Sequence, residues 1–95
     1  MSTFVMLSTL GPDGFATLHE NPHRLEAVNE EVEDLGVKIL HQYVLLGEYD
    51  FLTVVEAPDN ATMATLATRL AARGTLKTRT IATIDVPDFI AALEG

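Results

Sequence analysis

Apolar residues gather in four short runs that are rich in β-branched and aromatic side chains, and such runs predict β-strands. They cover residues 3–10, 37–46, 50–57 and 76–84. Only Gly47-Glu48-Tyr49 separates the second run from the third, which is short enough for a tight hairpin.

Two segments between these runs repeat apolar residues at the spacing of a helix. Asn21-Pro22 and Pro58-Asp59 provide N-cap and first-turn signals, and Gly36 and Gly74 are natural stops. We expect one helix in each segment, with the acidic residues of the first on its solvated side. The two apolar stripes consist of Leu25, Val28, Val32 and Leu35, and of Met63, Leu66, Ala67, Leu70 and Ala71.

The remaining segments complete the expected fold. Gly11-Pro12-Asp13-Gly14 has the composition of a turn, and we expect a loop from there to residue 21. Asp85 and Pro87 start a short helix over residues 86–93. The order is β-α-β-β-α-β with a terminal helix, which predicts an α+β, ferredoxin-like fold and a single domain over residues 1–95.

The strands have apolar residues on both faces, although a sheet with one wet face alternates apolar and polar positions. In the first strand Phe4 and Met6 share one face, whereas Val5 and Leu7 share the other. Two helices can cover only one face of four strands, and monomers rarely expose a large apolar patch. We therefore expect a homodimer or a multiple of dimers, with Phe4 or Phe51 as candidates for a side chain that faces the partner.

Composition excludes several classes of function. The 95 residues include 6 Lys and Arg against 14 Asp and Glu, which gives a net charge of -8 and disfavours nucleic acid and anionic membranes as partners. The absence of cysteine excludes disulfides and thiolate chemistry. No targeting segment, phosphate loop or dinucleotide turn is recognisable, so we expect a cytoplasmic protein without a cofactor.

One segment matches the zinc-protease pattern H-E-x-x-H, namely His19-Glu20-Asn21-Pro22-His23. That chemistry requires both histidines on one face of a continuous helix. Pro22 would break such a helix, so we place His19 in the loop and His23 at the start of the next helix, and we expect no metal site.

Polar groups within the apolar strands are the candidates for a ligand site. His41 and Tyr43 share a face of the second strand, and Glu56 lies near the end of the third. Counted outward from the hairpin, His41 and Glu56 are nearly equidistant, so a symmetric register would let them form a proton-transfer pair. A structural hydrogen bond is the alternative. Arg79 could bind an anionic ligand or pair with an acidic neighbour.

The chain resembles the GYD domain family. The resemblance rests on Gly47-Glu48-Tyr49-Asp50 and Glu56-Ala57-Pro58-Asp59, supported by Pro22-His23-Arg24-Leu25 and Thr78-Arg79-Thr80, and it spans nearly the whole chain. Membership implies a ferredoxin-like fold of the dimeric α/β-barrel type. It implies no reaction, and none of the three histidines belongs to the family pattern.

The signature residues have plausible structural roles. We expect Gly47 to supply the unusual dihedral of a tight turn, Asp50 to accept backbone N–H bonds in that turn, and Asp59 to cap a helix. Tyr49 would pack at the sheet edge or across the dimer. The alternative is a site at the barrel mouth that uses Tyr49, Asp50 and Glu56.

Three candidate functions, each of a different class, are compatible with these observations. The first is a small-molecule-binding module with the ligand held between sheet and helices. The second is a cofactor-independent oxygenase or isomerase, by analogy of fold alone. The third is a structural or assembly protein without a ligand site. An enclosed pocket lined by His41, Tyr43 or Glu56 would favour the first two, and an interior filled by side chains would favour the third.

Overall fold

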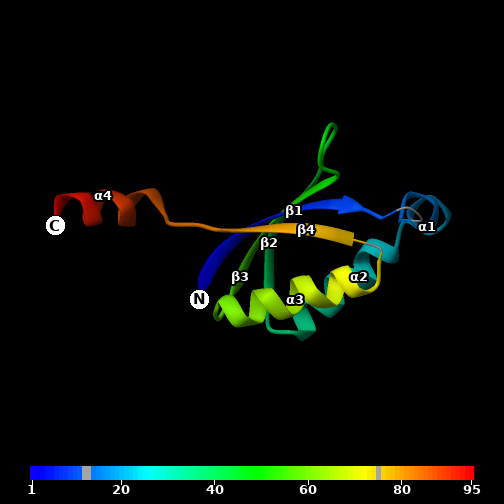
Figure 1. Ribbon diagram of the computed structural model, residues 1–95, viewed down its shortest axis with the longest axis horizontal. Coiled ribbons are helices and arrows are strands. Elements are labelled where there is room, and N and C mark those ends of the chain that lie inside the picture. Colours follow the sequence, from blue (N-terminus) through cyan, green and yellow to red (C-terminus); the bar gives the residue numbers. More distant parts are fainter. Residues whose placement is uncertain (12–13, 75) are drawn as a thin grey trace.

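The computed structural model describes residues 1–11, 14–74 and 76–95. The described strands form one antiparallel sheet in the order β2-β3-β1-β4 (Figure 1). This arrangement confirms the predicted α+β, ferredoxin-like fold. The elements are β1 (Ser2–Leu10), α1 (Gly14–Glu20), α2 (Arg24–Asp34), β2 (Lys38–Val44), β3 (Phe51–Ala57), α3 (Asn60–Ala72), β4 (Leu76–Ala82) and α4 (Val86–Glu94).

The segment after β1 differs from the sequence prediction. We expected a loop up to residue 21, but Gly14–Glu20 forms the helix α1, and Asn21 N–H continues it by donating to the Thr17 carbonyl over 3.0 Å. Seven residues make only two turns, which is too short for an apolar period to stand out. The predicted turn before it includes Pro12 and Asp13, which lie outside the described residues.

The start of α2 also differs from the prediction, whereas its end agrees. His23 occupies the N-cap position without a side-chain cap, and Asn21 instead belongs to the end of α1. At the other end Gly36 has a φ of 86°, and Val37 N–H donates to the Val32 carbonyl over 3.4 Å. This is the Schellman arrangement expected of a helix that stops at glycine.

The core lies between one face of the sheet and the two longer helices, α2 and α3 (Figure 1). The ion pair between Arg73 and Glu31 joins the end of α3 to α2 on the outside. Because every second residue of β1 and β3 is buried here, the period of two in the strands matches coverage on one face. The buried cluster consists of Phe4, Met6, Val32, Val37, Val55, Ala57, Met63, Leu66 and Leu70.

No described helix covers the opposite side of the sheet, which we call the open face. It is defined by the residues of β1 and β3 between the buried ones, namely Thr3, Val5, Leu7, Thr9, Leu52, Val54 and Glu56, and by the residues that pair with them on β2 and β4. The predicted division of side chains between two faces is thus confirmed. Phe4 and Phe51 both lie on the helix-covered face, so neither is the partner-facing side chain that we considered.

Candidate interaction surface

Four of the residues predicted as a ligand site lie on the open face, and Tyr49 and Asp50 lie in the loop between β2 and β3. His41 and Tyr43 stack on each other on β2, with ring centroids 6.4 Å apart and ring planes inclined by 12°. Arg79 lies on β4, directly opposite Leu7 of β1. Because β3 and β1 lie between β2 and β4, the two groups are separated by three strand spacings, about 14 Å.

The direct pairing of His41 with Glu56 is wrong. His41 lies opposite Val54, and Glu56 lies opposite Lys38 on β2 and Thr3 on β1. The hairpin register is centred between residues 47 and 48, and a bulge between residues 39 and 41 shifts the remaining pairs. The described residues therefore show His41 and Glu56 only as diagonal neighbours on the open face, without a hydrogen bond between them.

The loop between β2 and β3 rises from the sheet on the side away from α2 and α3 (Figure 1). Gly47 has a φ of 130° there, which confirms that a glycine supplies the unusual dihedral of this turn. We expected the Asp50 side chain to accept backbone hydrogen bonds within its own turn. It accepts one from Leu10 N–H of β1 instead, over 2.8 Å. Asp50 thus anchors the loop to the neighbouring strand, and Leu46 at the tip is fully exposed.

The N-terminus of α3 is fixed by the predicted cap. The Asp59 carboxylate accepts hydrogen bonds from the backbone N–H and the hydroxyl of Thr62, each over 2.8 Å. These bonds favour the charged form and lower the pKa of Asp59 below its ordinary value of 3.8. This signature residue therefore has a structural role at the start of α3.

The H-E-x-x-H segment is divided between two helices. His19 lies in the last turn of α1 rather than in a loop, whereas His23 precedes α2 as predicted. The His23 ring pairs with the Glu26 carboxylate over 3.2 Å at the surface. No group of three or more potential metal ligands occurs within the described part of the chain.

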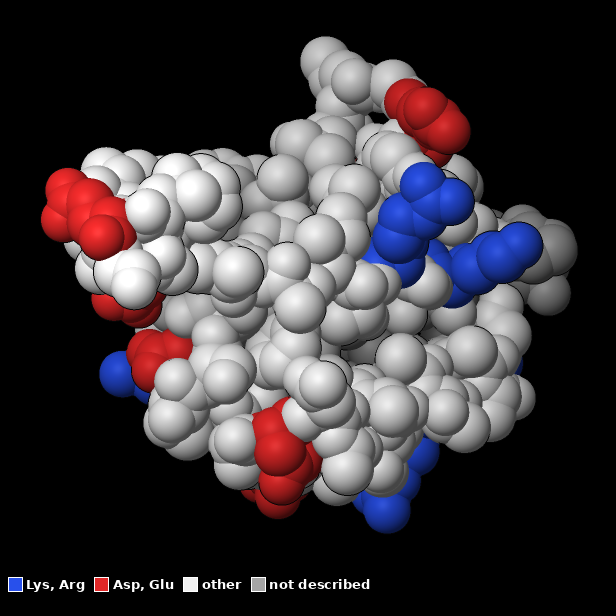
Figure 2. All heavy atoms as spheres, turned by 60° about the vertical axis from the view of Figure 1, so that its left-hand side comes forward, with Lys and Arg blue, Asp and Glu red and all other residues white. Residues whose placement is uncertain are grey.

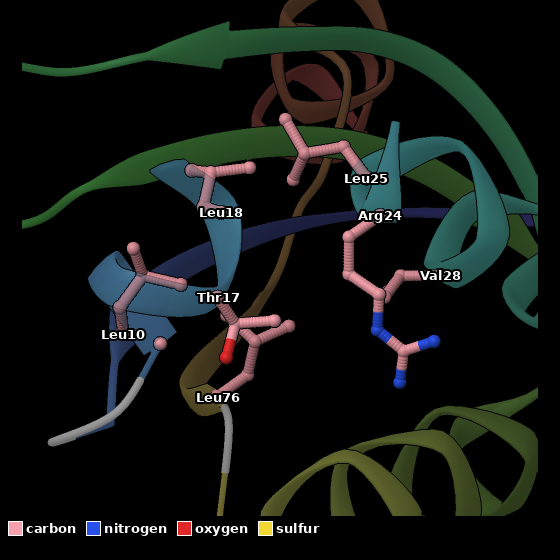
Figure 3. A pocket seen from close by; sticks show the side chains of 8 residues that line it. Leu10, Thr17, Leu18, Arg24, Leu25, Val28 and Leu76 are labelled. Atoms are coloured by element: carbon pink, nitrogen blue, oxygen red, sulfur yellow. The ribbon is translucent and has the colours of Figure 1, made fainter. Parts of the chain in front are cut away.

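Two hollows lie between the sheet and the helices. One, of about 270 Å³, is open to solvent between α3 and the strands β1 and β4, and none of the described side chains that line it is titratable. A small apolar cavity lies among β1, α1, α2 and β4, with Leu10, Leu18, Leu25 and Leu76 around it (Figure 3). Its free volume is about 40 Å³, close to that of a single water molecule. Ligand pockets usually measure about 300–1,000 Å³, so this cavity does not provide the expected chamber for a ligand.

A wider hollow of about 400 Å³ opens at the surface near the start of β4. Leu7 and Thr9 of β1, Tyr49 of the loop, and Lys77 and Arg79 of β4 line it. It therefore brings together two of the predicted site residues, Tyr49 and Arg79. Figure 2 shows two basic side chains side by side, with one acidic group above them and further acidic groups at the left and lower edges of the view.

The terminal helix α4 extends away from the rest of the molecule (Figure 1). It buries none of its residues, and Val86, Phe89, Ile90 and Leu93 are between 48% and 72% exposed. The sequence predicted the helix and its apolar side, but not that this side would lack a cover. The sequence did indicate that α4 needs a surface to pack on, because the helix has only nine residues, four of them large and apolar and none basic.

Comparison with known proteins identifies the family of this chain. The GYD domain model matches residues 4–93. The chain belongs to the GYD domain family. A relative from Thermus thermophilus, named glutamine synthetase and cystathionine beta-lyase binding protein, is 52% identical over 95 residues, which is 99% of this chain and 100% of the relative.

Solved structures support the fold of this GYD domain protein. FFRP-DM1 has a TM-score of 0.58 at 20% identity and covers 88% of this chain and 100% of that one. TTHA0845, also from Thermus thermophilus, has a TM-score of 0.56 at 20% identity and covers 90% of this chain and 96% of that one. At this identity the likeness concerns the fold alone. None of the described helices is long and apolar enough to cross a membrane.

Proposed function

We propose that this GYD domain protein is a binding protein for enzymes, with glutamine synthetase and cystathionine β-lyase as its first candidate partners. The observation that carries the proposal is the 52% identity, over the full length of both chains, to a relative named for binding these two enzymes. The action of the protein is then to occupy a surface of a larger enzyme. The cytoplasmic location expected from the sequence is part of the same proposal.

The arrangement of polar groups supports binding rather than catalysis. An oxygenase or isomerase needs acid, base and substrate to converge within hydrogen-bond reach. Here the described residues show no hydrogen bond between His41 and its diagonal neighbour Glu56. Arg79 lies at the opposite edge of the sheet, and Asp50 is engaged with β1. A small-molecule module is less favoured for a different reason. The cavity beside α1 holds only about 40 Å³, and the hollow of about 270 Å³ between α3 and β4 is open to solvent and contains none of the predicted site residues.

We also propose that the open face is covered by a second copy of the chain, as the sequence led us to expect. Val5, Leu7, Leu52 and Val54 lie on this face, and no described helix of the same chain covers them. A contiguous apolar surface of this kind is typical of an interface. Because each protomer has the same face, a two-fold axis would cover both faces at once.

Titration against the two enzymes tests the main proposal. The purified protein is passed over immobilised glutamine synthetase and cystathionine β-lyase of the same organism, and surface plasmon resonance records binding. We expect saturable binding to at least one of them with a dissociation constant of about 10 μM or tighter. Absence of binding to both at about 100 μM would overturn the proposal, whatever the oligomeric state.

A variant at the tip of the β2–β3 loop locates the contact. Leu46 is 101% exposed and supports no packing within the chain, so Leu46→Ser leaves the fold intact. We expect it to weaken enzyme binding by about tenfold, as for loss of one apolar anchor. Phe15→Ser on α1, also an exposed apolar position, is the matched control that should bind like wild type.

A further inference from the structure

The helix α4 lacks the support that an isolated helix of its length requires. Helices shorter than about 12–15 residues are marginal in water, and α4 has nine residues and no buried side chain. Its apolar residues Val86, Phe89, Ile90 and Leu93 follow the spacing i, i+3, i+4 and i+7, so they form one continuous stripe. A surface outside its own chain is needed to cover this stripe.

The charges beside the stripe indicate what that surface carries. At about 100° per residue, Asp85 and Glu94 lie along the two borders of the stripe, whereas Asp88 lies on the opposite side of the helix. The segment 85–94 contains no basic residue. The complementary surface should therefore be apolar with basic groups at its border.

The hollow at the start of β4 has this chemistry. Leu7 and Tyr49 provide apolar surface, and Lys77 and Arg79 are two of the six basic residues of the chain. The described residues show neither Lys77 nor Arg79 in an ion pair within the chain. The hollow is thus matched in charge to the border of the α4 stripe.

The two features lie at opposite ends of β4, so one chain cannot bring them together without rearranging. Lys77 pairs with Thr9 at one end of the strand, and Ala82 pairs with Phe4 at the other, about 17 Å away. The α4 helix continues outward beyond Ala82 (Figure 1). A two-fold axis that crosses the strands reverses their direction and places the α4 end of one copy over the Lys77 end of the other.

We propose that α4 of each protomer packs its apolar stripe into the Lys77–Arg79 hollow of a second copy. This inference rests on the proposed self-association through the open face and adds the element that crosses between the copies. It is independent of enzyme binding. Glu94 supports it in one further respect, since a carboxylate at a helix C-terminus is unfavourable for the helix itself and gains from a basic partner.

Engineered cysteines test the contact directly, because the natural chain contains none. Leu93→Cys protein is mixed with Thr9→Cys protein and oxidised mildly, and mass spectrometry identifies the products. We expect a mixed disulfide dimer of Leu93→Cys with Thr9→Cys. Ala91→Cys, on the side of α4 away from the stripe, should give at least about tenfold less mixed dimer with the same partner.

Charge reversal provides a second measurement in the intact chain. Glu94→Lys places a positive charge at the C-terminus of α4, where it stabilises the helix, so a weaker dimer cannot arise from melting of α4. We expect its dimer dissociation constant, measured by sedimentation, to rise about fivefold to tenfold, and Arg79→Glu in the same chain to restore most of the loss. Ala91→Lys adds a basic group near the same end of α4 but on the side away from the stripe, where it also favours the helix, and should dimerise like wild type.

The outcomes separate the possible failures. A wild-type protein that sediments as a monomer overturns self-association and this inference together, but leaves enzyme binding untouched. The α4 contact alone is overturned if the dimer gives no mixed disulfide above the Ala91→Cys level. It is also overturned if Glu94→Lys leaves the dimer dissociation constant unchanged. A disulfide within one chain of the Leu93→Cys/Thr9→Cys double variant, at monomer mass, also overturns it, since α4 would then fold back on its own sheet.

Discussion

The two faces of the sheet carry similar apolar side chains and have different surroundings. On one face Phe4, Met6 and Val55 are buried beneath α2 and α3. On the other, Val5 and Val54 remain half-buried with no described helix above them. The same residue types thus serve a core on one side and an uncovered surface on the other. Strand alternation therefore reveals which residues share a face, but not what covers that face.

The helices α3 and α4 repeat this contrast. The Asp59 cap starts α3, and its apolar residues Met63, Leu66 and Leu70 are buried. The N-cap residue of α4, Asp85, makes no side-chain cap bond, and the apolar residues that follow remain exposed. Since both helices have an apolar stripe, their difference depends on position relative to the sheet.

Adjacent valines on β3 give the largest expected contrast. Val55 is 0% exposed, so Val55→Asp buries an unpaired charge, which costs about 3–5 kcal/mol or more and is comparable to the whole stability of a small domain. Val54→Asp places the same charge on the open face and should leave each protomer folded. Circular dichroism with urea titration measures folding, and sedimentation measures the dimer.

We expect Val55→Asp to be unfolded and Val54→Asp to be a folded monomer. Equal unfolding by both variants would show that the two faces do not differ in the way that the structure indicates. A folded dimer of Val54→Asp would remove the open face as the interface.

Leucines on the two helices give the next contrast. Leu66 of α3 is 0% exposed, and Leu66→Ala should lower the free energy of unfolding by about 2–5 kcal/mol. Leu93 of α4 is 72% exposed, and Leu93→Ala should change protomer stability by less than about 0.5 kcal/mol. Urea denaturation at concentrations where the protein is monomeric measures both, and a large loss with Leu93→Ala would mean that α4 packs on its own chain.

A smaller difference is expected between the helix caps. Asp59→Ala removes the hydrogen bonds to Thr62 and should lower the midpoint of thermal unfolding by a few degrees. Asp85→Ala removes no cap bond and should shift the midpoint much less. Thermal melts followed by circular dichroism compare the two, and equal shifts would contradict the difference between the helices.

The smallest effect is the pH dependence of the α3 cap. The folded-state pKa of Asp59 is lowered, so its contribution to stability is present above the ordinary value of 3.8 and is lost as the pH falls through the folded pKa. Asp59→Asn keeps a cap acceptor but does not titrate. The stability advantage of wild type over Asp59→Asn should therefore shrink below about pH 4. An advantage that stays constant between about pH 6 and about pH 3 would exclude this linkage.

Some of the candidate site could be predicted from the sequence, and some could not. The shared face of His41 and Tyr43 followed from the period of two, and the Asp59 cap followed from local chemistry. The pairing of His41 with Glu56 failed because the hairpin register is centred between residues 47 and 48, which places His41 opposite Val54, and the bulge near Leu40 then moves Glu56 further away, to Lys38. The bond from Leu10 to Asp50 joins residues 40 positions apart, which turn chemistry does not reveal.

The linear pattern of residues is enough to predict the strands, the three longer helices, the stop at Gly36 and the two-faced apolar character of β1 and β3. These features depend on residue spacing and on dihedral preferences, which are properties of short segments. The folded arrangement was needed to show that α2 and α3 cover the face of Phe4, that the open face carries Lys77 and Arg79 beside Leu7, and that α4 projects without a cover. Burial depends on which surfaces meet in space, whereas the apolar pattern of a segment specifies only that some surface must cover it.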